Sequence, residues 1–138
     1  MFRKSMFSLL AIVFAALLAA QVNAGGQNNY RLRANLTGPG LASGKAVYRE
    51  RQRNNITEQR FSIEVEDATP GTIMTVAVNG TTVGMIVIND LGVGELEYRT
   101  PQFIDDPGDG DPIPDGFPHL IAGDAVTVGP LSGEFVSN

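Results

Sequence analysis

Five aspartates in one glycine- and proline-rich segment are the densest set of chemically capable side chains in the sequence. They are Asp105, Asp106, Asp109, Asp111 and Asp115. Calcium takes about six to eight oxygen ligands, and aspartates around a glycine, as in Asp109-Gly110-Asp111, can wrap such an ion. However, prolines interrupt the segment, and the D-x-[DN]-x-[DN]-G pattern of an EF-hand loop is not met. Two hypotheses follow: a calcium site, or a stiff, solvated loop that keeps an exposed sheet edge from pairing with other chains.

The single histidine, His119, is the only imidazole available for acid–base chemistry. It lies between Phe117-Pro118 and Leu120-Ile121, a setting that favours a packed side chain over a catalytic base. A hydrolase would pair His119 with an aspartate such as Asp124 and with a nucleophile, but no serine lies in the Gly-x-Ser-x-Gly context of a nucleophile elbow. The absence of cysteine excludes thiol catalysis, disulfides and Cys/His zinc sites. A small hydrolase around His119 remains an alternative.

Two further kinds of site are weakly indicated. Glu64, Glu66, Glu95 and Glu97 could supply a carboxylate pair for glycoside hydrolysis. Because they alternate with apolar residues, they fit the solvent face of strands more simply. Gly92-Val93-Gly94 lacks the third glycine and the βαβ unit of a dinucleotide fingerprint, so no cofactor other than calcium is indicated.

Charge is unevenly distributed along the chain. The sequence has 10 basic and 15 acidic residues, and Arg3 and Lys4 stand apart near its start. Most of the remaining basic residues precede Phe61: Arg31, Arg33, Lys45, Arg49, Arg51, Arg53 and Arg60. Overall acidity argues against a nucleic-acid partner, since phosphate contacts need a basic surface. The basic segment could form a patch for an anionic glycan or lipid head group, or its arginines could pair with later glutamates as ordinary surface ion pairs.

The first 24 residues have the features of a secretory signal. Arg3 and Lys4 give a positive start, an apolar stretch follows, and Val22-Asn23-Ala24 suits a signal peptidase. Cleavage after Ala24 would leave residues 25–138, with no second apolar run long enough to span a membrane. We therefore expect a secreted or periplasmic protein. Three Asn-x-Thr sequons begin at Asn35, Asn55 and Asn79.

Beyond the signal, the pattern predicts strands and no helix. Alternation of apolar and polar residues, or runs of β-branched residues, predicts strands over residues 30–36, 45–49, 60–66, 73–78, 81–88, 93–99, 125–128 and 131–136. Asn79-Gly80 is a strong hairpin signal because asparagine and glycine tolerate positive φ. Residues 51–58 have no apolar run and are expected to form a mobile polar loop. We expect a single domain over residues 25–138, an antiparallel β-sandwich of about eight short strands, with a small β-barrel as the alternative.

An ordered set of strand and turn motifs lies between Leu41 and Pro101. It comprises Ser43-Gly44-Lys45-Ala46-Val47-Tyr48, Phe61-Ser62-Ile63-Glu64-Val65, Pro70-Gly71-Thr72, Val78-Asn79-Gly80 and Val83-Gly84. The stretch resembles secreted β-domains of bacteria and, more distantly, the chordin-type (CHRD) extracellular domain. It departs from the CHRD pattern, in which a histidine-containing strand follows the central hairpin. The resemblance implies an extracellular β-fold without established catalysis, and it transfers no functional residue.

Together these observations predict a secreted, non-enzymatic β-sandwich module with a binding or structural role outside the cytoplasm. Its expected partner is an extracellular protein or glycan. The alternatives are a calcium-stabilised adhesion or carbohydrate-binding module that uses residues 105–115, and the small hydrolase around His119.

Overall fold

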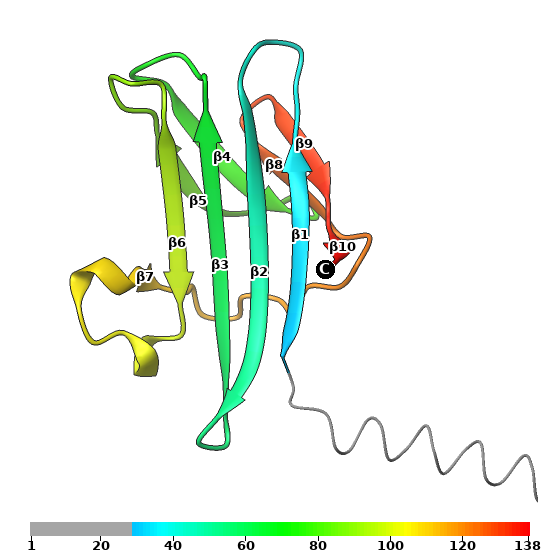
Figure 1. Cartoon of the computed structure of the whole chain (residues 1–138), viewed down its shortest axis with the longest axis vertical. Coiled ribbons are helices and arrows are strands. Elements are labelled where there is room, and N and C mark those ends of the chain that lie inside the picture. The colour runs from blue at the N-terminus through cyan, green and yellow to red at the C-terminus, as the bar shows by residue number, and fades with distance from the viewer. Residues whose placement is uncertain (1–28) are drawn as a thin grey trace, which may run out of the picture.

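The computed structural model describes residues 29–138, which form two stacked β-sheets (Figure 1). The expected signal, residues 1–24, lies outside the described residues. Helical structure in the described part consists of two 3-10 turns, η1 (Pro101–Phe103) and η2 (Pro107–Asp109). Neither is long or apolar enough to cross a membrane.

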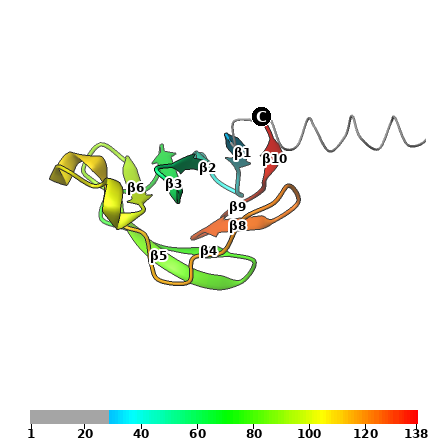
Figure 2. The same cartoon turned by 90° about the horizontal axis from the view of Figure 1, so that it is seen from below.

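The larger sheet has six strands in the order β10-β1-β2-β3-β6-β7, and the smaller has four in the order β5-β4-β8-β9. The strands of the larger sheet are β1 (Tyr30–Leu36), β2 (Ser43–Arg53), β3 (Ile56–Glu66), β6 (Gly94–Arg99), β7 (Asp111–Pro112) and β10 (Val136–Ser137). Those of the smaller sheet are β4 (Ile73–Val78), β5 (Thr81–Val87), β8 (Ala125–Val128) and β9 (Leu131–Glu134). The short β7 runs parallel to β6, and the other neighbouring strands are antiparallel. The sheets lie face to face and do not close into a barrel (Figure 2), so the predicted all-β sandwich is confirmed.

The core lies between the two sheets and follows from the alternation in the sequence. In β1, Leu32, Ala34 and Leu36 are buried, and the residues between them are exposed. On the neighbouring strands, Tyr48 and Phe61 are fully buried in the same layer. Burying one face of each strand supplies the hydrophobic free energy of the fold and turns every intervening side chain outward.

The Asn79-Gly80 hairpin is confirmed. It joins β4 to β5, and both turn residues have positive φ, 47° and 82°. Asparagine and glycine tolerate this left-handed conformation, so the turn matches the right-handed twist of the strands.

The prediction of a mobile loop over residues 51–58 is wrong. β2 and β3 continue through this segment in unbroken antiparallel register and meet at a turn in which Asn54 and Asn55 have φ of 50° and 62°. The hairpin projects below the body of the sandwich (Figure 1), where the second sheet does not cover it. Polar residues therefore occupy both of its faces, and the period-two signal of a half-buried strand is lost.

The end of the chain also differs from the prediction. Residues 131–136 were expected to form one strand, but β9 ends at Glu134 and β10 begins at Val136 in the other sheet. Phe135 lies between them and is fully buried. With β7 and β10, each of two residues, the described part of the chain has ten strands rather than about eight.

The connection over residues 113–124 crosses the lower end of the sandwich, shown in orange in Figure 1. It covers that end of the core with Phe117 and Leu120, which are 9% and 0% exposed. The same connection carries His119 to the start of β1.

Gly133 marks a close approach of the two sheets and provides a test of the fold. A Cβ atom at this position would collide with the backbone carbonyl oxygen of Asn35 on β1. We expect Gly133→Ala to lower the free energy of unfolding by about 2 kcal/mol, because a backbone clash must be relieved by moving one sheet. Gly40→Ala is the matched control, since nothing lies within 4 Å of its added methyl group. Urea unfolding measures both variants; equal stability of the two would contradict the close packing.

Candidate anion-binding face

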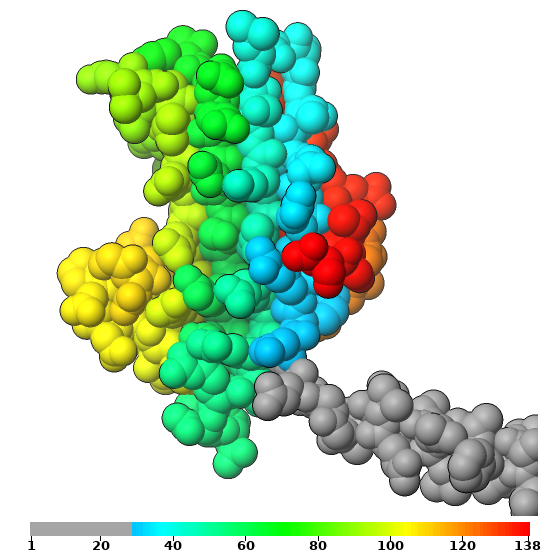
Figure 3. Space-filling view, in the orientation of Figure 1, coloured from blue at the N-terminus to red at the C-terminus, as the bar shows by residue number. Residues whose placement is uncertain are grey.

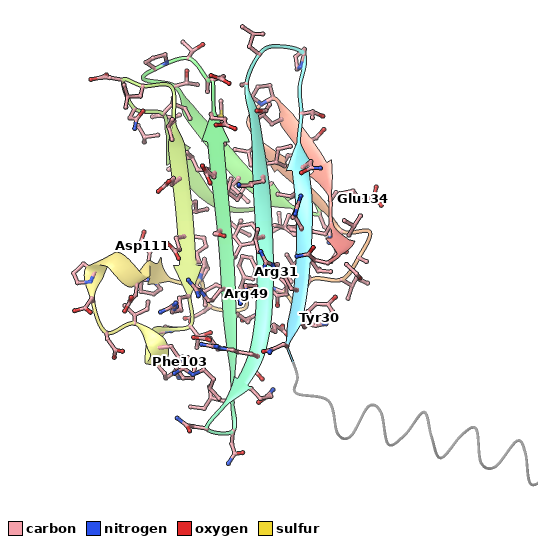
Figure 4. The ribbon with its side chains drawn as sticks, viewed as in Figure 1. Tyr30, Arg31, Arg49, Phe103, Asp111 and Glu134 are labelled. Atoms are coloured by element: carbon pink, nitrogen blue, oxygen red, sulfur yellow. The ribbon has the colours of Figure 1, made fainter. Side chains whose placement is uncertain are left out.

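A row of four arginines crosses the outer face of the larger sheet. Arg31 on β1 pairs with Arg49 on β2, Arg49 with Arg60 on β3, and Arg60 with Arg99 on β6. Side chains at paired positions point to the same face of a sheet. We call these four residues the arginine row. Figure 3 shows this face head-on, and Figure 4 shows Arg31 and Arg49 side by side on β1 and β2.

The row is electrostatically unfavourable for the protein alone. Like charges directly opposite one another on neighbouring strands destabilise a sheet. Two members have acidic partners: Arg60 lies 3.0 Å from Glu97, and Arg99 lies 3.8 Å from Asp109. Among residues 29–138, no carboxylate lies within 4.0 Å of the guanidinium of Arg31 or Arg49. These two arginines can therefore bind an anion supplied from outside the described chain.

The positive field of the row acts on Arg49. Partial burial and the neighbouring guanidinium groups of Arg31, Arg60 and Arg51 lower its pKa, and Glu58 opposes them. An anion bound beside Arg49 would reverse this effect, because an opposite charge favours the protonated guanidinium.

Glu58 is the buried counter-ion beside the row. Its side chain is only 1% exposed, although its position on β3 faces outward. Its carboxylate accepts a hydrogen bond of 2.6 Å from Nε of Arg51 and one of 3.4 Å from Arg53. Arg99 approaches the same carboxylate at 4.0 Å. One carboxylate thus holds the arginines of the β2–β3 hairpin in place and neutralises part of their charge.

The 3-10 segment after β6 covers this end of the face. The guanidinium of Arg53 lies 4.8 Å from the ring centre of Phe103, a cation–π contact. Arg99 donates a hydrogen bond of 3.3 Å to the carbonyl oxygen of Phe103. Its Nε atom is buried and makes no hydrogen bond to any described residue. Arg99 is therefore held against the sheet, and it forms the shielded end of the row.

A hollow of about 120 Å³ lies at the other end, where β1 begins and the β2–β3 hairpin continues past it. It is lined by Asn29, Tyr30, Arg31, Arg49, Glu50, Arg51, Glu58 and Arg60. Its two carboxylates are already engaged, Glu58 by arginines and Glu50 by Tyr48 and His119. Arg31 and Arg49 are consequently the guanidinium groups in the hollow that have no acidic partner among the described residues.

The sequence hypotheses about charge are confirmed only in part. The alternative of ordinary surface ion pairs holds for Arg60 with Glu97 and for Lys45 with Glu64, at 3.0 and 3.9 Å. It is wrong for Arg31, Arg33 and Arg49, which have no ion pair among the described residues. The burial of Glu58 was not predicted, because residues 51–58 were expected to form a loop. Recognising Asn54-Asn55 as a hairpin turn would have placed Glu58 opposite Arg51.

The aspartate-rich segment, residues 105–115, lies at one edge of the larger sheet. Both oxygens of Asp109 are engaged: Oδ2 accepts hydrogen bonds from the backbone N–H groups of Asp105 and Asp106, and Oδ1 lies 3.8 Å from Arg99. Those backbone hydrogen bonds are the main cause of the lowered pKa of Asp109. Asp111 begins β7, which pairs with the edge of β6, and Asp115 is exposed in a turn.

These positions bear on the calcium hypothesis. Within residues 29–138, the structure brings together no group of three or more His, Cys, Asp or Glu side chains that could hold a metal ion. The alternative hypothesis, a stiff loop that keeps a sheet edge from pairing, agrees better with the position of β7 along β6. A calcium site remains a prediction from the sequence, without support from the geometry.

His119 takes part in a packed polar cluster. Its Nδ1 lies 2.7 Å from Oε1 of Glu50, and its ring stacks on Tyr30 with centroids 5.2 Å apart. The Tyr48 phenol donates to the same Glu50 and accepts a hydrogen bond of 3.0 Å from Gln59. No hydrogen bond joins His119 to a serine in the described part of the chain. This arrangement locks the 113–124 connection onto β2, and it supplies no nucleophile for the hydrolase hypothesis.

The glutamates considered for glycoside hydrolysis lie on the outer face of the larger sheet. Glu64 pairs directly with Glu95, and Glu97 lies one outward position nearer the arginine row. Glu64 and Glu97 form the ion pairs with Lys45 and Arg60 described above. The simpler hypothesis of a solvent face agrees with these positions.

No protein-family model matches the chain, and no curated protein sequence matches it either. The resemblance to the CHRD domain therefore rests on its motifs alone, which lie on β2 to β5 and in the turns between them. It stays a prediction.

Two substitutions on this face should have opposite effects on stability. Arg49→Gln removes a guanidinium that faces like charges, so we expect the free energy of unfolding to stay unchanged or to rise by up to about 1 kcal/mol. High salt should make any such rise smaller, because it screens the repulsion. Glu58→Gln removes a buried counter-ion, so we expect a loss of about 1–3 kcal/mol. Glu64→Gln, an exposed carboxylate on the same strand and face, is the control and should change stability by less than about 0.5 kcal/mol. Equal destabilisation by Arg49→Gln and Glu58→Gln in thermal melts would show that the row is not repulsive.

Tyr48 should make stability sensitive to alkaline pH. Burial and the hydrogen bond to Glu50 raise its pKa above the ordinary value of 10.0 for a tyrosine phenol. A group whose pKa is higher in the folded state than in the unfolded chain contributes stability that is fully present below the unfolded value. That contribution is lost as pH rises toward the folded value.

Tyr48→Phe should therefore flatten the fall in unfolding free energy between about pH 9 and pH 11. The slope that remains in the variant comes from other groups, including Tyr30 and Tyr98, whose pKa values are also raised. Urea unfolding across this range measures the difference. An unchanged slope in the variant would show that Tyr48 does not titrate differently in the two states.

Proposed function

We propose that this protein is a secreted, non-enzymatic β-sandwich module that binds an anionic ligand through the arginine row. One observation carries the proposal: Arg31 and Arg49 lie directly opposite each other, with no carboxylate within 4.0 Å in the described residues. Such a pair is unfavourable for folding. A bound oxyanion would convert this repulsion into two charge-assisted interactions.

The chemistry of the row supports binding rather than catalysis. Guanidinium groups stay protonated near neutral pH, so they do not serve as general acids or bases there. Their planar arrays of N–H donors match carboxylate, sulfate and phosphate oxygens, often through two parallel hydrogen bonds. The strands also hold the backbones of these arginines rigidly, which reduces the conformational entropy that the protein loses on binding.

The export proposal comes from the sequence of residues 1–24, which lie outside the described part. It implies a ligand outside the cytoplasm, and it favours an anionic glycan or an acidic protein segment over cytoplasmic nucleotides. The hairpin arginines that Glu58 neutralises lie beside the row, so the outer-face arginines without an acidic partner among the described residues are Arg31 and Arg49 on the row and Arg33 next to it on β1.

Titration with dextran sulfate, followed by calorimetry, tests the proposal. We expect saturable binding that weakens with added salt, because bound counter-ions are released and charges are screened. The double variant Arg31→Ala/Arg49→Ala should lose about tenfold or more in affinity, since charge-assisted hydrogen bonds contribute about 1.5–3 kcal/mol each before solvent screening.

Lys45→Ala is the matched control, because it removes one positive charge from the same sheet face away from the row. It should change affinity by less than about twofold, as expected for a rim charge. If the double variant and the control lose the same affinity, the ligand responds to net charge and the row is not its site. Absence of any saturable binding by the wild type would overturn the proposal.

A further inference from the structure

We infer that the ligand is a linear acidic polysaccharide that lies across the strands along the arginine row. The inference rests on the proposed function and specifies its ligand. It derives from the shape of the positive surface, from the charges on either side of it and from the state of the aromatic side chains near it.

The row is long and narrow. Its four arginines occupy four consecutive strands, and neighbouring strands are about 4.8 Å apart, so the row is about 14 Å long. It is perpendicular to the strands. A regularly charged chain in this direction could place one anionic group near each of Arg31 and Arg49 and extend toward Arg60 and Arg99, whose guanidinium groups also contact Glu97 and Asp109.

Over β3 and β6, acidic residues limit the positive surface on one side of the row, whereas β1 and β2 carry Arg33 and Lys45 on that side. The next outward positions along β3 and β6 are Ser62 and Glu97, and Glu64 and Glu95 follow as a directly opposed pair. A flat anionic membrane resting on this face would bring its head groups against these glutamates. Repulsion of this kind disfavours a broad anionic surface and leaves room for a narrow one.

The hairpin limits the positive surface on the other side. Arg51 and Arg53 are both bound to Glu58, and Arg53 also lies against the ring of Phe103. These contacts reduce the charge available below the row. The unpartnered guanidinium groups of Arg31 and Arg49 therefore lie in a strip, with Arg33 one outward position away on β1.

In the described part of the chain, Tyr30 is the aromatic side chain that lines the hollow beside Arg31 and Arg49, and its ring is already stacked on His119, which disfavours single-stranded nucleic acid. Tyr48 is fully buried, Tyr98 is only partly exposed and donates its hydroxyl group to the carbonyl oxygen of Val83, and Tyr30 stacks on His119. Proteins that bind single strands without sequence preference combine positive charge with exposed rings on which bases stack. A polysaccharide needs no such platform to place its anionic groups on arginines.

The test compares the affinity of residues 25–138, the chain expected after signal cleavage, for acidic oligosaccharides of increasing length. Oligogalacturonates supply carboxylates and dextran sulfate oligomers supply sulfates, so the two arms distinguish the anionic group. We expect affinity to rise roughly three- to tenfold with each added anionic group until the oligomer spans the row, and then to level off.

Two single variants on β1 sharpen the test. Arg31→Ala removes the terminal member of the row, so the affinity should level off at a shorter oligomer. Arg33→Ala is the matched control: it is an exposed arginine on the same strand and face, but it pairs with Val47 and Val136 outside the row. It should leave unchanged the oligomer length at which the affinity levels off.

Each contrary result has a distinct meaning. Affinity that does not depend on length would indicate a site for a single oxyanion, which overturns this inference and leaves the proposed function intact. Preference for phosphatidylserine vesicles, or for single-stranded poly(dT), over both saccharides at equal salt would overturn it in favour of a membrane or nucleic acid. If Arg31→Ala and Arg33→Ala shift equally the oligomer length at which the affinity levels off, the ligand does not follow the row.

Discussion

The antiparallel register of β2 and β3 is the constraint on which the rest of the structure depends. The two strands pair without interruption from Ser43 opposite Glu66 to Arg53 opposite Ile56. This register places Tyr48 beside Phe61 in the core and Arg49 beside Arg60 on the outer face. Because side chains alternate with period two, a slip of one residue would turn the arginines inward and the rings outward. The hydrophobic core therefore determines the arginine row, although no arginine belongs to the core.

The same register imposes a repulsion that the fold must offset. Removing water from Tyr48, Phe61 and their neighbours favours this pairing by more than the opposed guanidinium groups disfavour it, since the charges are exposed and screened while the rings are fully buried. Glu58 reduces the repulsion further by binding Arg51 and Arg53. Arg31 and Arg49 receive no such compensation from the described residues. Residues retained at some expense of stability are characteristic of functional sites.

Much of the fold could be predicted from sequence. For the candidate site, Arg31, Arg49 and Arg60 were recognised as part of a possible basic patch, but their alignment with Arg99 in one row was not. Strands with one buried face, such as β1, and the Asn79-Gly80 hairpin carry local signals that are sufficient to place them. The hairpin over residues 51–58 has no apolar face, because it extends past the second sheet, so its pattern could not be distinguished from a loop. The arginine row depends on register across four strands, and spacing within one strand does not reveal register. The aspartates of residues 105–115 were prominent because they are close in sequence, but Asp109 serves to cap the segment rather than to join the others around an ion.

Selectivity follows from the combination of a fixed spacing with an acidic surrounding surface. The chain carries a formal net charge of −5, so a polyanion that approaches elsewhere meets carboxylates and is repelled. For the proposed ligand, favourable contact is expected mainly along the row, where neighbouring strand backbones are about 4.8 Å apart. Arginines on adjacent strands cannot adjust this interval as freely as lysines on a flexible loop could. A ligand whose charges repeat at a compatible interval can engage several arginines together, and a ligand with irregular charges engages only one or two. If the proposed ligand binds along the row, the rigid sheet would favour ligands whose charges repeat at an interval compatible with the strand spacing.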